Sequence, residues 1–198
     1  MQEHPQGIPF IKDNPTQSVQ QVFDGAILRL YYNQIQLPNG QWVERELIHH
    51  LPAVCILADN DQGQVVLVKQ FRPAVAQMIY EVPAGIIDIN GDQLEDPLKA
   101  AQRELNEETG YCSDNWSSGP SLYVSPGYLD EEICFFRAKG IRKVDQQLAQ
   151  DENEDVSCHL FTEAEIQDLI QQGQINDLKT LYALQIWLAE RRAEDGIF

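Results

Sequence analysis

Basic residues and long hydrophobic runs are both scarce in this sequence. Of its 198 residues, 14 are Lys or Arg and 31 are Asp or Glu, which gives a formal net charge of −17. A field of that sign repels nucleic acids and anionic membranes, and it attracts divalent cations. The longest apolar run, Ala53–Ala58, is far shorter than the roughly 20 residues that a membrane span needs. We therefore expect neither nucleic acid nor a membrane as a partner.

The sequence also lacks the short motifs of several other protein classes. No C-x-x-C pair occurs among its four cysteines, so neither a zinc knuckle nor a redox pair is indicated. The motifs G-x-x-x-x-G-K-[ST], G-x-G-x-x-G, G-x-S-x-G and H-E-x-x-H are absent too. The first residues hold no basic segment followed by an apolar one. Scattered cysteines without an export signal lead us to expect a cytoplasmic protein.

What the sequence does contain is typical of a globular protein, with 43% hydrophobic and 23% charged residues. Residues 1–17 are polar and are expected to form a flexible arm. Two β-rich segments follow, around a Pro38-Asn39-Gly40 turn that predicts a hairpin. This part is too short to bury a core alone, so it must pack on the rest of the chain or on a second copy. We therefore expect an N-terminal arm and β-hairpin domain (residues 1–50) and a main domain (residues 51–198).

The main domain mixes hairpins with helices and does not alternate strand and helix regularly. Strands are expected at residues 54–58, 64–71, 78–82, 121–125, 133–137 and 156–161. Helices are expected from Asp96-Pro97 to Gly110, from a capping box at Thr162 to Gly173, and over residues 177–192, where Leu178, Leu181, Leu184 and Leu188 are core candidates. This order favours an α+β fold with a mixed sheet over a doubly wound parallel sheet.

The helix over residues 97–109 carries the most informative pattern. Its buried stripe is expected to consist of Leu98, Ala101 and Leu105. Glu104 and Glu108 lie on the flank of that stripe, with Glu107 beside them. Three like charges near a helix C-terminus repel one another and face the unfavourable end of the helix dipole. A hard divalent cation such as Mg²⁺ resolves the conflict, although a lone acidic cluster is more often a solvated helix face.

The surroundings of the three glutamates resemble the box of the Nudix hydrolase family. The usual form is G-x5-E-x7-R-E-U-x-E-E-x-G-U, and every fixed position from Glu95 to Tyr111 matches it. The spacing before Glu95 departs from the pattern, because nine residues separate it from Gly85. Residues 90–93 look like a four-residue loop insertion, which puts the shape of that loop in question but not the helix.

The resemblance extends to the ADP-ribose pyrophosphatase branch of the family. The segments that carry it are Pro83-Ala84-Gly85, Ser125–Glu131 and Asp151–Val156. It implies a Nudix α/β/α sandwich with a mixed sheet and a small N-terminal antiparallel β-domain, and a homodimer. The implied reaction is Mg²⁺-dependent hydrolysis of ADP-ribose to AMP and ribose 5-phosphate, with Mn²⁺ as a possible substitute metal. Alternatives are another nucleoside diphosphate sugar such as GDP-mannose, or a catalytically silent ADP-ribose sensor.

The resemblance also implies roles for individual residues. The implied metal ligands are the Ala84 carbonyl, Glu104, Glu107 and Glu108. The implied catalytic residues are Glu152 as the base on a mobile loop, Glu154 as its alternative, Glu107, and Arg103, which is expected to pair with Glu95. The implied substrate contacts are Arg45, Arg72 and Glu131. The aromatic residue that stacks on adenine is left open between Phe23, Tyr31 and Tyr128, because Ala26 falls near the usual place.

Overall fold

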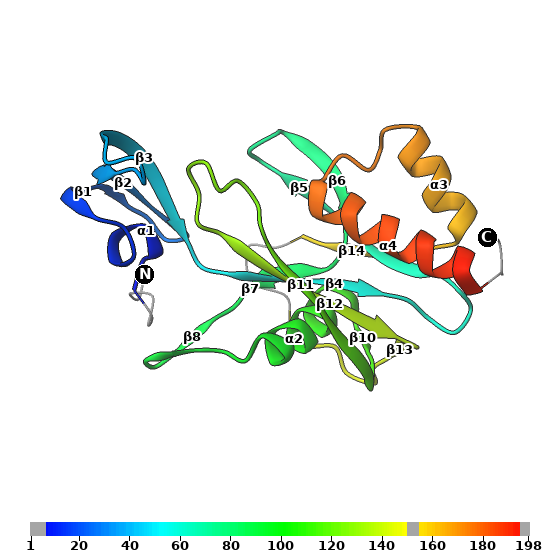
Figure 1. Ribbon diagram of the computed structural model, residues 1–198. Helices are drawn as coiled ribbons and strands as arrows, with labels where there is room; N and C mark the ends of the chain where they lie inside the picture. Colours follow the sequence, from blue (N-terminus) through cyan, green and yellow to red (C-terminus); the bar gives the residue numbers. More distant parts are fainter. Residues whose placement is uncertain (1–6, 150–154, 195–198) are drawn as a thin grey trace. The chain divides into compact units, whose positions relative to one another are not determined.

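The computed structural model describes residues 7–149 and 155–194 (Figure 1). Contacts divide the chain into two compact units. The first unit contains Met1–Ala53, Ile86–Pro97 and Pro120–Cys134, and the second contains Val54–Gly85, Leu98–Gly119 and Phe135–Phe198. No helix in the described ranges is both long and apolar enough to span a bilayer.

The first unit is built on a three-stranded antiparallel sheet. Its strands are β1 (Thr16–Asp24), β2 (Leu28–Gln36) and β3 (Trp42–His50), with β2 in the centre. Gly40 lies in the predicted turn between β2 and β3 at φ +86°, a conformation that glycine adopts without strain. The four-residue insertion is the tip of a second, short hairpin, in which β8 (Ile89–Asn90) pairs with β9 (Gln93–Leu94). The insertion is thus a closed hairpin of the first unit.

The prediction of a flexible arm over residues 1–17 is wrong for most of the described residues of that segment. Residues Pro9–Lys12 form the short helix α1, and β1 begins at Thr16. Phe10 is buried because its ring packs edge-on against Tyr31 of β2, with centroids 5.5 Å apart. A single aromatic anchor therefore holds this segment on the sheet, and its polar composition gave no sign of that contact.

The second unit is a layered arrangement of sheets and helices. One sheet consists, in this order, of the strands β11 (Asn115–Tyr123), β12 (Glu132–Lys139), β4 (Ala53–Ala58) and β7 (Ala84–Ile86). Most residues of these four strands belong to the second unit. The strands β14 (Ser157–Phe161), β5 (Val65–Arg72) and β6 (Gln77–Glu81) form an antiparallel sheet, and β10 (Tyr111–Cys112) pairs with β13 (Arg142–Lys143).

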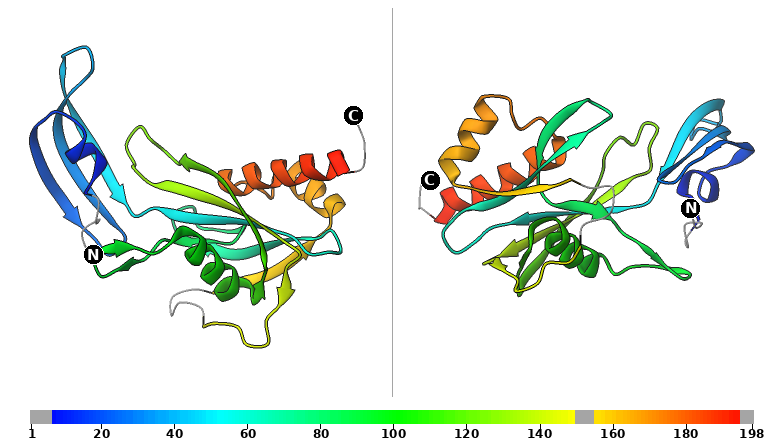
Figure 2. Two further views of the ribbon diagram at one scale, coloured as in Figure 1. Left: turned by 60° about the horizontal axis from the view of Figure 1, so that its bottom comes forward. Right: turned by 180° about the vertical axis from the view of Figure 1, so that it is seen from behind.

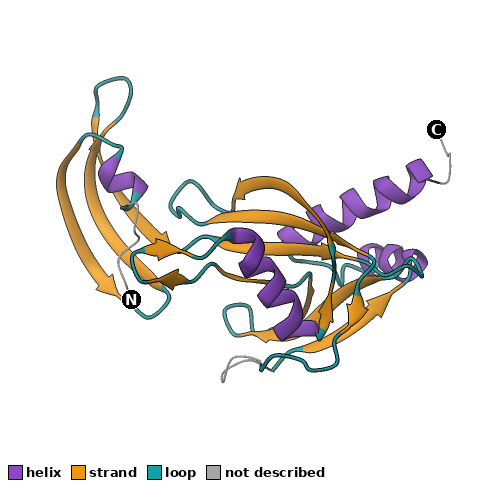
Figure 3. Cartoon of the chain, turned by 90° about the horizontal axis from the view of Figure 1, so that it is seen from below, coloured by secondary structure: helices purple, strands orange, loops and turns teal. Residues whose placement is uncertain are grey.

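Three helices cover these sheets. The helix α2 (Pro97–Thr109) lies on one side, and α3 (Glu163–Gln171) and α4 (Leu178–Glu194) lie on the other (Figures 1 and 2). The capping box at Thr162 is present at the start of α3. Two core candidates are wrong, because Leu98 and Leu178 are exposed at the first turns of their helices. Figure 3 shows the chain from below, coloured by secondary structure.

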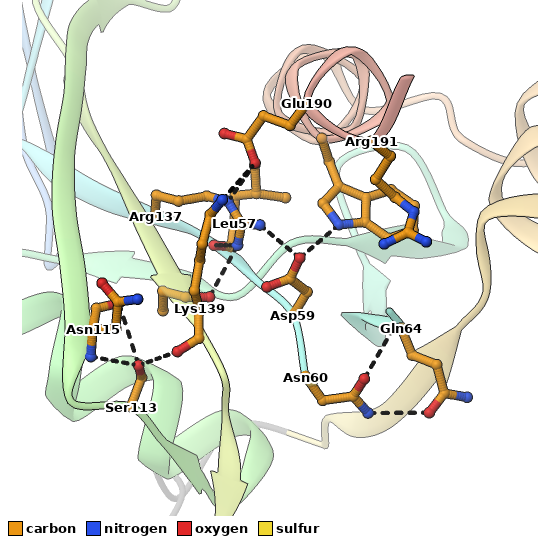
Figure 4. Close-up of polar contacts among 12 residues, drawn as sticks. Leu57, Asp59, Asn60, Gln64, Ser113, Asn115, Arg137, Lys139, Glu190 and Arg191 are labelled. Carbon is orange, nitrogen blue, oxygen red and sulfur yellow. Dashed lines mark hydrogen bonds and ion pairs between the residues drawn. The ribbon is translucent and has the colours of Figure 1, made fainter. Parts of the chain in front are cut away.

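A buried polar network fixes α4 on the sheet of the second unit (Figure 4). Arg137 of β12 donates to Asp59 at 2.6 Å and to Glu190 of α4 at 3.1 Å. Trp187, fully buried in α4, donates its indole N–H to the same Asp59 carboxylate at 2.9 Å. Because Arg137 is itself buried, these charges are paired in a region of low dielectric.

Candidate active site

The three glutamates of α2 differ in burial although they lie within one helical turn and a half. Pro97 opens the helix, and Gly110 ends it with φ +67°, a left-handed conformation suited to a residue without a side chain. Glu104 and Glu108 are only 8% and 2% exposed, whereas the Glu107 side chain is 22% exposed. Burial of two carboxylates is costly unless they are partnered. The contacts of Glu104 and Glu108 therefore decide how the helix accommodates two buried acids.

Both buried carboxylates meet the short segment Ala84–Gly85 at the start of β7. The Glu108 carboxylate accepts a hydrogen bond from the Ala84 backbone N–H at 3.0 Å. The Glu104 carboxylate lies where a side chain on residue 85 would begin, so that a Cβ at Gly85 would collide with it. Glycine is required here for close approach and not for its backbone freedom, because its φ is not positive. The structure thus brings Ala84, Glu104 and Glu108 together.

Arg103 supplies the positive charge of this cluster. Its Nη1 donates to Glu104 at 2.7 Å and to Glu107 at 3.0 Å. Three carboxylates and one guanidinium leave a net charge of −2 on this part of the helix. The Arg103 contacts therefore reduce the repulsion between Glu104 and Glu107. The expected Arg103–Glu95 pair stays a prediction.

The donor chemistry of this cluster fits a hard divalent cation. Carboxylate and carbonyl oxygens are the ligands that Mg²⁺ and Mn²⁺ prefer, and Mg²⁺ usually takes only one or two carboxylates from the protein. Within residues 7–149 and 155–194, no three His, Cys, Asp or Glu side chains converge closely enough to enclose an ion as they stand. The carboxylates gathered on one side of α2 and the close approach of Glu104 to Gly85 are the features of the structure that fit such an ion.

Arg72, at the end of β5, is held by a buried acid at the end of β6. Its Nε and Nη2 donate to the two oxygens of Glu81 at 2.6 and 2.8 Å. Glu81 is 2% exposed, whereas the Arg72 side chain is 43% exposed. The hydrogen bond to Glu81 raises the pKa of Arg72, and the charge of Glu108 raises it further. Arg72 is therefore a fixed cation within electrostatic range of the α2 glutamates.

Glu81 has a second cationic partner in Lys179, from the first turn of α4. The ammonium group donates to Glu81 and, at 3.0 Å, to Asp177. Burial alone raises the pKa of Glu81, but the bonds and charges of Arg72 and Lys179 outweigh burial and lower it. Burial lowers the pKa of Lys179, but the charges of Glu81 and Asp177 outweigh burial and raise it. Arg72, Glu81 and Lys179 therefore remain charged at neutral pH.

The first unit contains two of the expected substrate contacts. Arg45 lies on β3, where Nη1 donates to the Glu44 carbonyl at 2.8 Å, and it lines a cavity of about 380 Å³. Aromatic and apolar side chains from α1, β3 and residues 123–129 line the same cavity, together with Asp130. Glu131 lies next in sequence, with its carboxylate 3.6 Å from His50 Nδ1. Arg45 is thus at a pocket that includes both apolar surface and charge.

The aromatic candidates for base stacking differ sharply in exposure. Tyr31 is 6% exposed because it packs under Phe10, so its ring faces are not available to a ligand. Phe23 and Tyr128 are 55% and 52% exposed, and Tyr128 lines the cavity beside Arg45. Burial removes Tyr31 from the set of candidates and leaves the other two. The expected catalytic bases, Glu152 and Glu154, lie outside the described residues.

Glu81 and Lys179 were not among the site residues predicted from the sequence. A signal for Glu81 was present, since it is the lone acid in the otherwise apolar and aromatic strand expected at residues 78–82. A signal for Lys179 was weaker. A lysine near the start of a helix interacts unfavourably with the helix dipole, but lysines at such positions are not rare. Neither signal identifies its partner, since 98 positions separate the two residues.

Comparison with known proteins matches most of the chain to one family. The model of the NUDIX domain matches residues 49–184. The chain is 35% identical over 173 residues to the ADP-ribose pyrophosphatase of Bacillus subtilis (strain 168), which covers 87% of this chain and 91% of that protein. At the same identity and coverage, it matches the methanol dehydrogenase activator of Bacillus methanolicus.

The fold agrees with a solved structure. The chain superposes with a TM-score of 0.77 on a protein described as an ADP compounds hydrolase, at 20% identity. The match covers 93% of this chain and 97% of the other. This likeness confirms the expected α+β architecture, with a mixed sheet and an N-terminal antiparallel sheet.

Proposed function

Because the chain belongs to the NUDIX domain family, we propose that it hydrolyses the pyrophosphate bond of ADP-ribose to give AMP and ribose 5-phosphate. The observation that carries the proposal is the convergence of the buried Glu104 and Glu108 carboxylates on the Ala84–Gly85 peptide. The name of the Bacillus subtilis relative, over nearly the whole of both chains, supports ADP-ribose as the substrate. The reaction depends on Mg²⁺, and Mn²⁺ is expected to replace it.

The Ala84 carbonyl, Glu104 and Glu108 hold the metal in this proposal, with Glu107 assisting. A metal held by these residues would supply positive charge against the charge that develops on the diphosphate, and would make a bound water more acidic. Gly85 lets the Glu104 carboxylate reach this position, and the hydrogen bond from the Ala84 N–H orients Glu108. These contacts direct two carboxylates before substrate binds, which lowers the cost of ordering them later.

Arginines supply the remaining positive charge for a substrate that carries about two negative charges. Arg72 binds a phosphate oxygen, since its guanidinium is fixed by Glu81 and half-exposed. Arg45 binds the substrate at the first unit's cavity, and Glu131 contacts the substrate from the same unit. Arg103 holds Glu104 and Glu107 in place. Glu152, with Glu154 as the alternative, removes the proton from the attacking water.

We further propose that residues 1–50 form a dimerisation domain and residues 51–198 the hydrolase domain, so that the working form is a homodimer. The exposed apolar side chains Val22, Phe23 and Trp42 on the first unit support an interface there. We place the protein in the cytoplasm, which the four free cysteines support. Sedimentation of the full chain, compared with that of Phe23→Ser, tests the dimer.

Product analysis tests the function directly. The purified protein is incubated with Mg²⁺ and a panel that includes ADP-ribose and GDP-mannose, and products are separated by ion-exchange chromatography. The proposal expects equimolar AMP and ribose 5-phosphate, with ADP-ribose among the best substrates. If ADP-ribose is among the poorest, the pyrophosphatase branch is assigned wrongly, and GDP-mannose becomes the first alternative.

A regulatory role is the second candidate, and it rests on the equally similar relative named as an activator of methanol dehydrogenase. The two roles separate in Glu104→Gln, which keeps the shape of the side chain but not its charge. A sensor that acts by binding alone keeps its effect on a partner dehydrogenase in this variant. An enzyme that acts by hydrolysis loses it.

A further inference from the structure

A cluster of four charges joins the start of α4 to the strand that leads into the active-site segment. Glu81 ends β6, three residues before Ala84. Asp177 immediately precedes α4, and Lys179 lies in the first turn of that helix. Arg72 completes the cluster from the end of β5. The four residues come from three elements of the second unit, so their arrangement is fixed by the fold and not by local sequence.

The contacts within the cluster form a continuous chain. One oxygen of Glu81, Oε2, accepts both Arg72 Nη2 and Lys179 Nζ. Lys179 Nζ also donates to Asp177 Oδ2 at 3.0 Å. Two cations therefore balance two anions, and the central carboxylate is 2% exposed. Removal of one member leaves an unbalanced charge in a buried position, which is costly.

Backbone groups of α4 and of the segment that follows β6 are linked by hydrogen bonds to the same cluster. Asp177 Oδ2 accepts the N–H of Thr180 at 3.0 Å and its hydroxyl at 2.6 Å. The Thr180 hydroxyl oxygen, fully buried, accepts the N–H of Val82 at 3.0 Å. The first turn of α4 thus holds the residue that follows Glu81.

The geometry of Arg72 leaves one of its nitrogens available. The side-on fork to Glu81 uses Nε and Nη2, which form one edge of the planar guanidinium. Nη1 lies across from that edge and donates to none of the described residues. Because two parallel hydrogen bonds fix the plane, the direction of Nη1 depends on the position of the Glu81 carboxylate.

We propose that Lys179 is a positioning residue for substrate binding: by anchoring Glu81 against α4, it holds Arg72 with Nη1 free for a phosphate oxygen of the substrate. The proposal rests on the proposed function of the site. Lys179 is 16% exposed and is engaged by two carboxylates, so it does not itself meet the substrate. Its effect is transmitted through Glu81.

The charge balance explains why loss of Lys179 affects Arg72. Without the lysine, Glu81 and Asp177 face one remaining cation, and the cluster carries a net charge of −1. Arg72 has a long side chain, half-exposed, and is drawn inward to serve both acids. A guanidinium that donates to both carboxylates is withdrawn from the diphosphate.

A mutant cycle on the full-length protein tests this coupling. Lys179→Met removes the charge at similar length, and we expect KM for ADP-ribose to rise by about tenfold or more, with a much smaller change in kcat. In an Arg72→Met background, which already lacks the guanidinium, the same substitution should leave KM unchanged. Lys139→Met, which removes the lysine that faces Glu190, is the matched control and should leave both constants unchanged.

The outcomes distinguish positioning from a merely structural role. If the two substitutions raise KM independently, so that their effects multiply, Lys179 does not act through Arg72 and the inference is wrong. A fall in kcat with unchanged KM also overturns it. If Lys179→Met does not fold, Lys179→Gln, which keeps a hydrogen-bond donor, gives the same comparison. If the wild type hydrolyses a different nucleoside diphosphate sugar, the proposed substrate is wrong, while the cycle remains valid on that compound.

Discussion

Replacement of Gly85 by Ala is expected to lower the activity strongly and to change the stability of the fold only slightly. The new methyl group collides with the Glu104 carboxylate, which is the end of a flexible side chain, and φ of residue 85 is not positive. The backbone therefore accepts alanine, and the carboxylate has to move. It must withdraw by roughly 1 Å or more to regain van der Waals separation.

The expected magnitudes for stability and activity differ widely. Moving the Glu104 side chain away from its preferred rotamer costs about 0.5–1.5 kcal/mol. Alanine also lowers the conformational entropy of the unfolded chain, and this offsets about 0.4–1 kcal/mol of that cost. The free energy of unfolding should therefore change by no more than about 1 kcal/mol. Misplacement of a catalytic group by about 1 Å costs on the order of a hundredfold in rate.

The assay is kcat/KM for ADP-ribose with Mg²⁺, alongside urea unfolding of Gly85→Ala. The matched control is the double variant with Glu104→Ala, in which the collision partner is absent. In that background, alanine at residue 85 should cost no further activity. Full activity in the single variant, or a second loss in the double variant, refutes the reasoning about close approach.

Four further outcomes follow from the structure. Arg137→Met should lower the free energy of unfolding by about 3 kcal/mol, because it leaves the partly buried Asp59 carboxylate without its cationic partner and with the Trp187 N–H alone. The exposed Arg142→Gln is the control in the same urea titration and should change nothing measurable. Glu104→Gln should reduce turnover by about a hundredfold or more and leave the melting temperature unchanged. Removal of divalent ions by EDTA should abolish turnover of the wild type, and added Mg²⁺ should restore it. Because the pKa of Glu81 is lowered in the folded protein, the ionised carboxylate contributes stability above pH 4.5, and this contribution is lost as the pH falls below that value. The melting temperature of Glu81→Gln should therefore decline less between about pH 7 and about pH 3 than that of the wild type. An equal decline contradicts the assignment. Burial raises the pKa of Cys158 to about 11, so iodoacetamide labelling at neutral pH, read by mass spectrometry, should be slow at this thiol until the protein unfolds, and rapid labelling of the native form contradicts that environment.

Local patterns were sufficient for much of the second unit. The proline and glycine that bound α2, the capping box of α3 and the alternation of the strands are all signals within a few residues of one another. The same locality explains why the α2 glutamates were found, since helical spacing alone places Glu104 and Glu108 on one flank. Their approach to Ala84–Gly85 agrees with the sequence resemblance, which had grouped these residues.

Contacts between distant residues were beyond such reasoning. Phe10 anchors α1 because its ring packs edge-on against Tyr31 of β2, and nothing in the arm itself shows that contact. Leu98 and Leu178 fit the apolar periodicity of their helices but lie at first turns, where the sheets no longer cover them. The Glu81–Lys179 pair depends on how α4 packs on β6, which is a property of the assembled second unit.

The site on α2 is tested most directly by locating a cation. Crystals soaked with Mn²⁺ and a non-hydrolysable ADP-ribose analogue give anomalous scattering at any bound manganese. We expect at least one peak within bonding distance of Glu104, Glu108 and a phosphate oxygen of the analogue. An analogue bound elsewhere, with no peak beside these two carboxylates, contradicts the proposed mechanism.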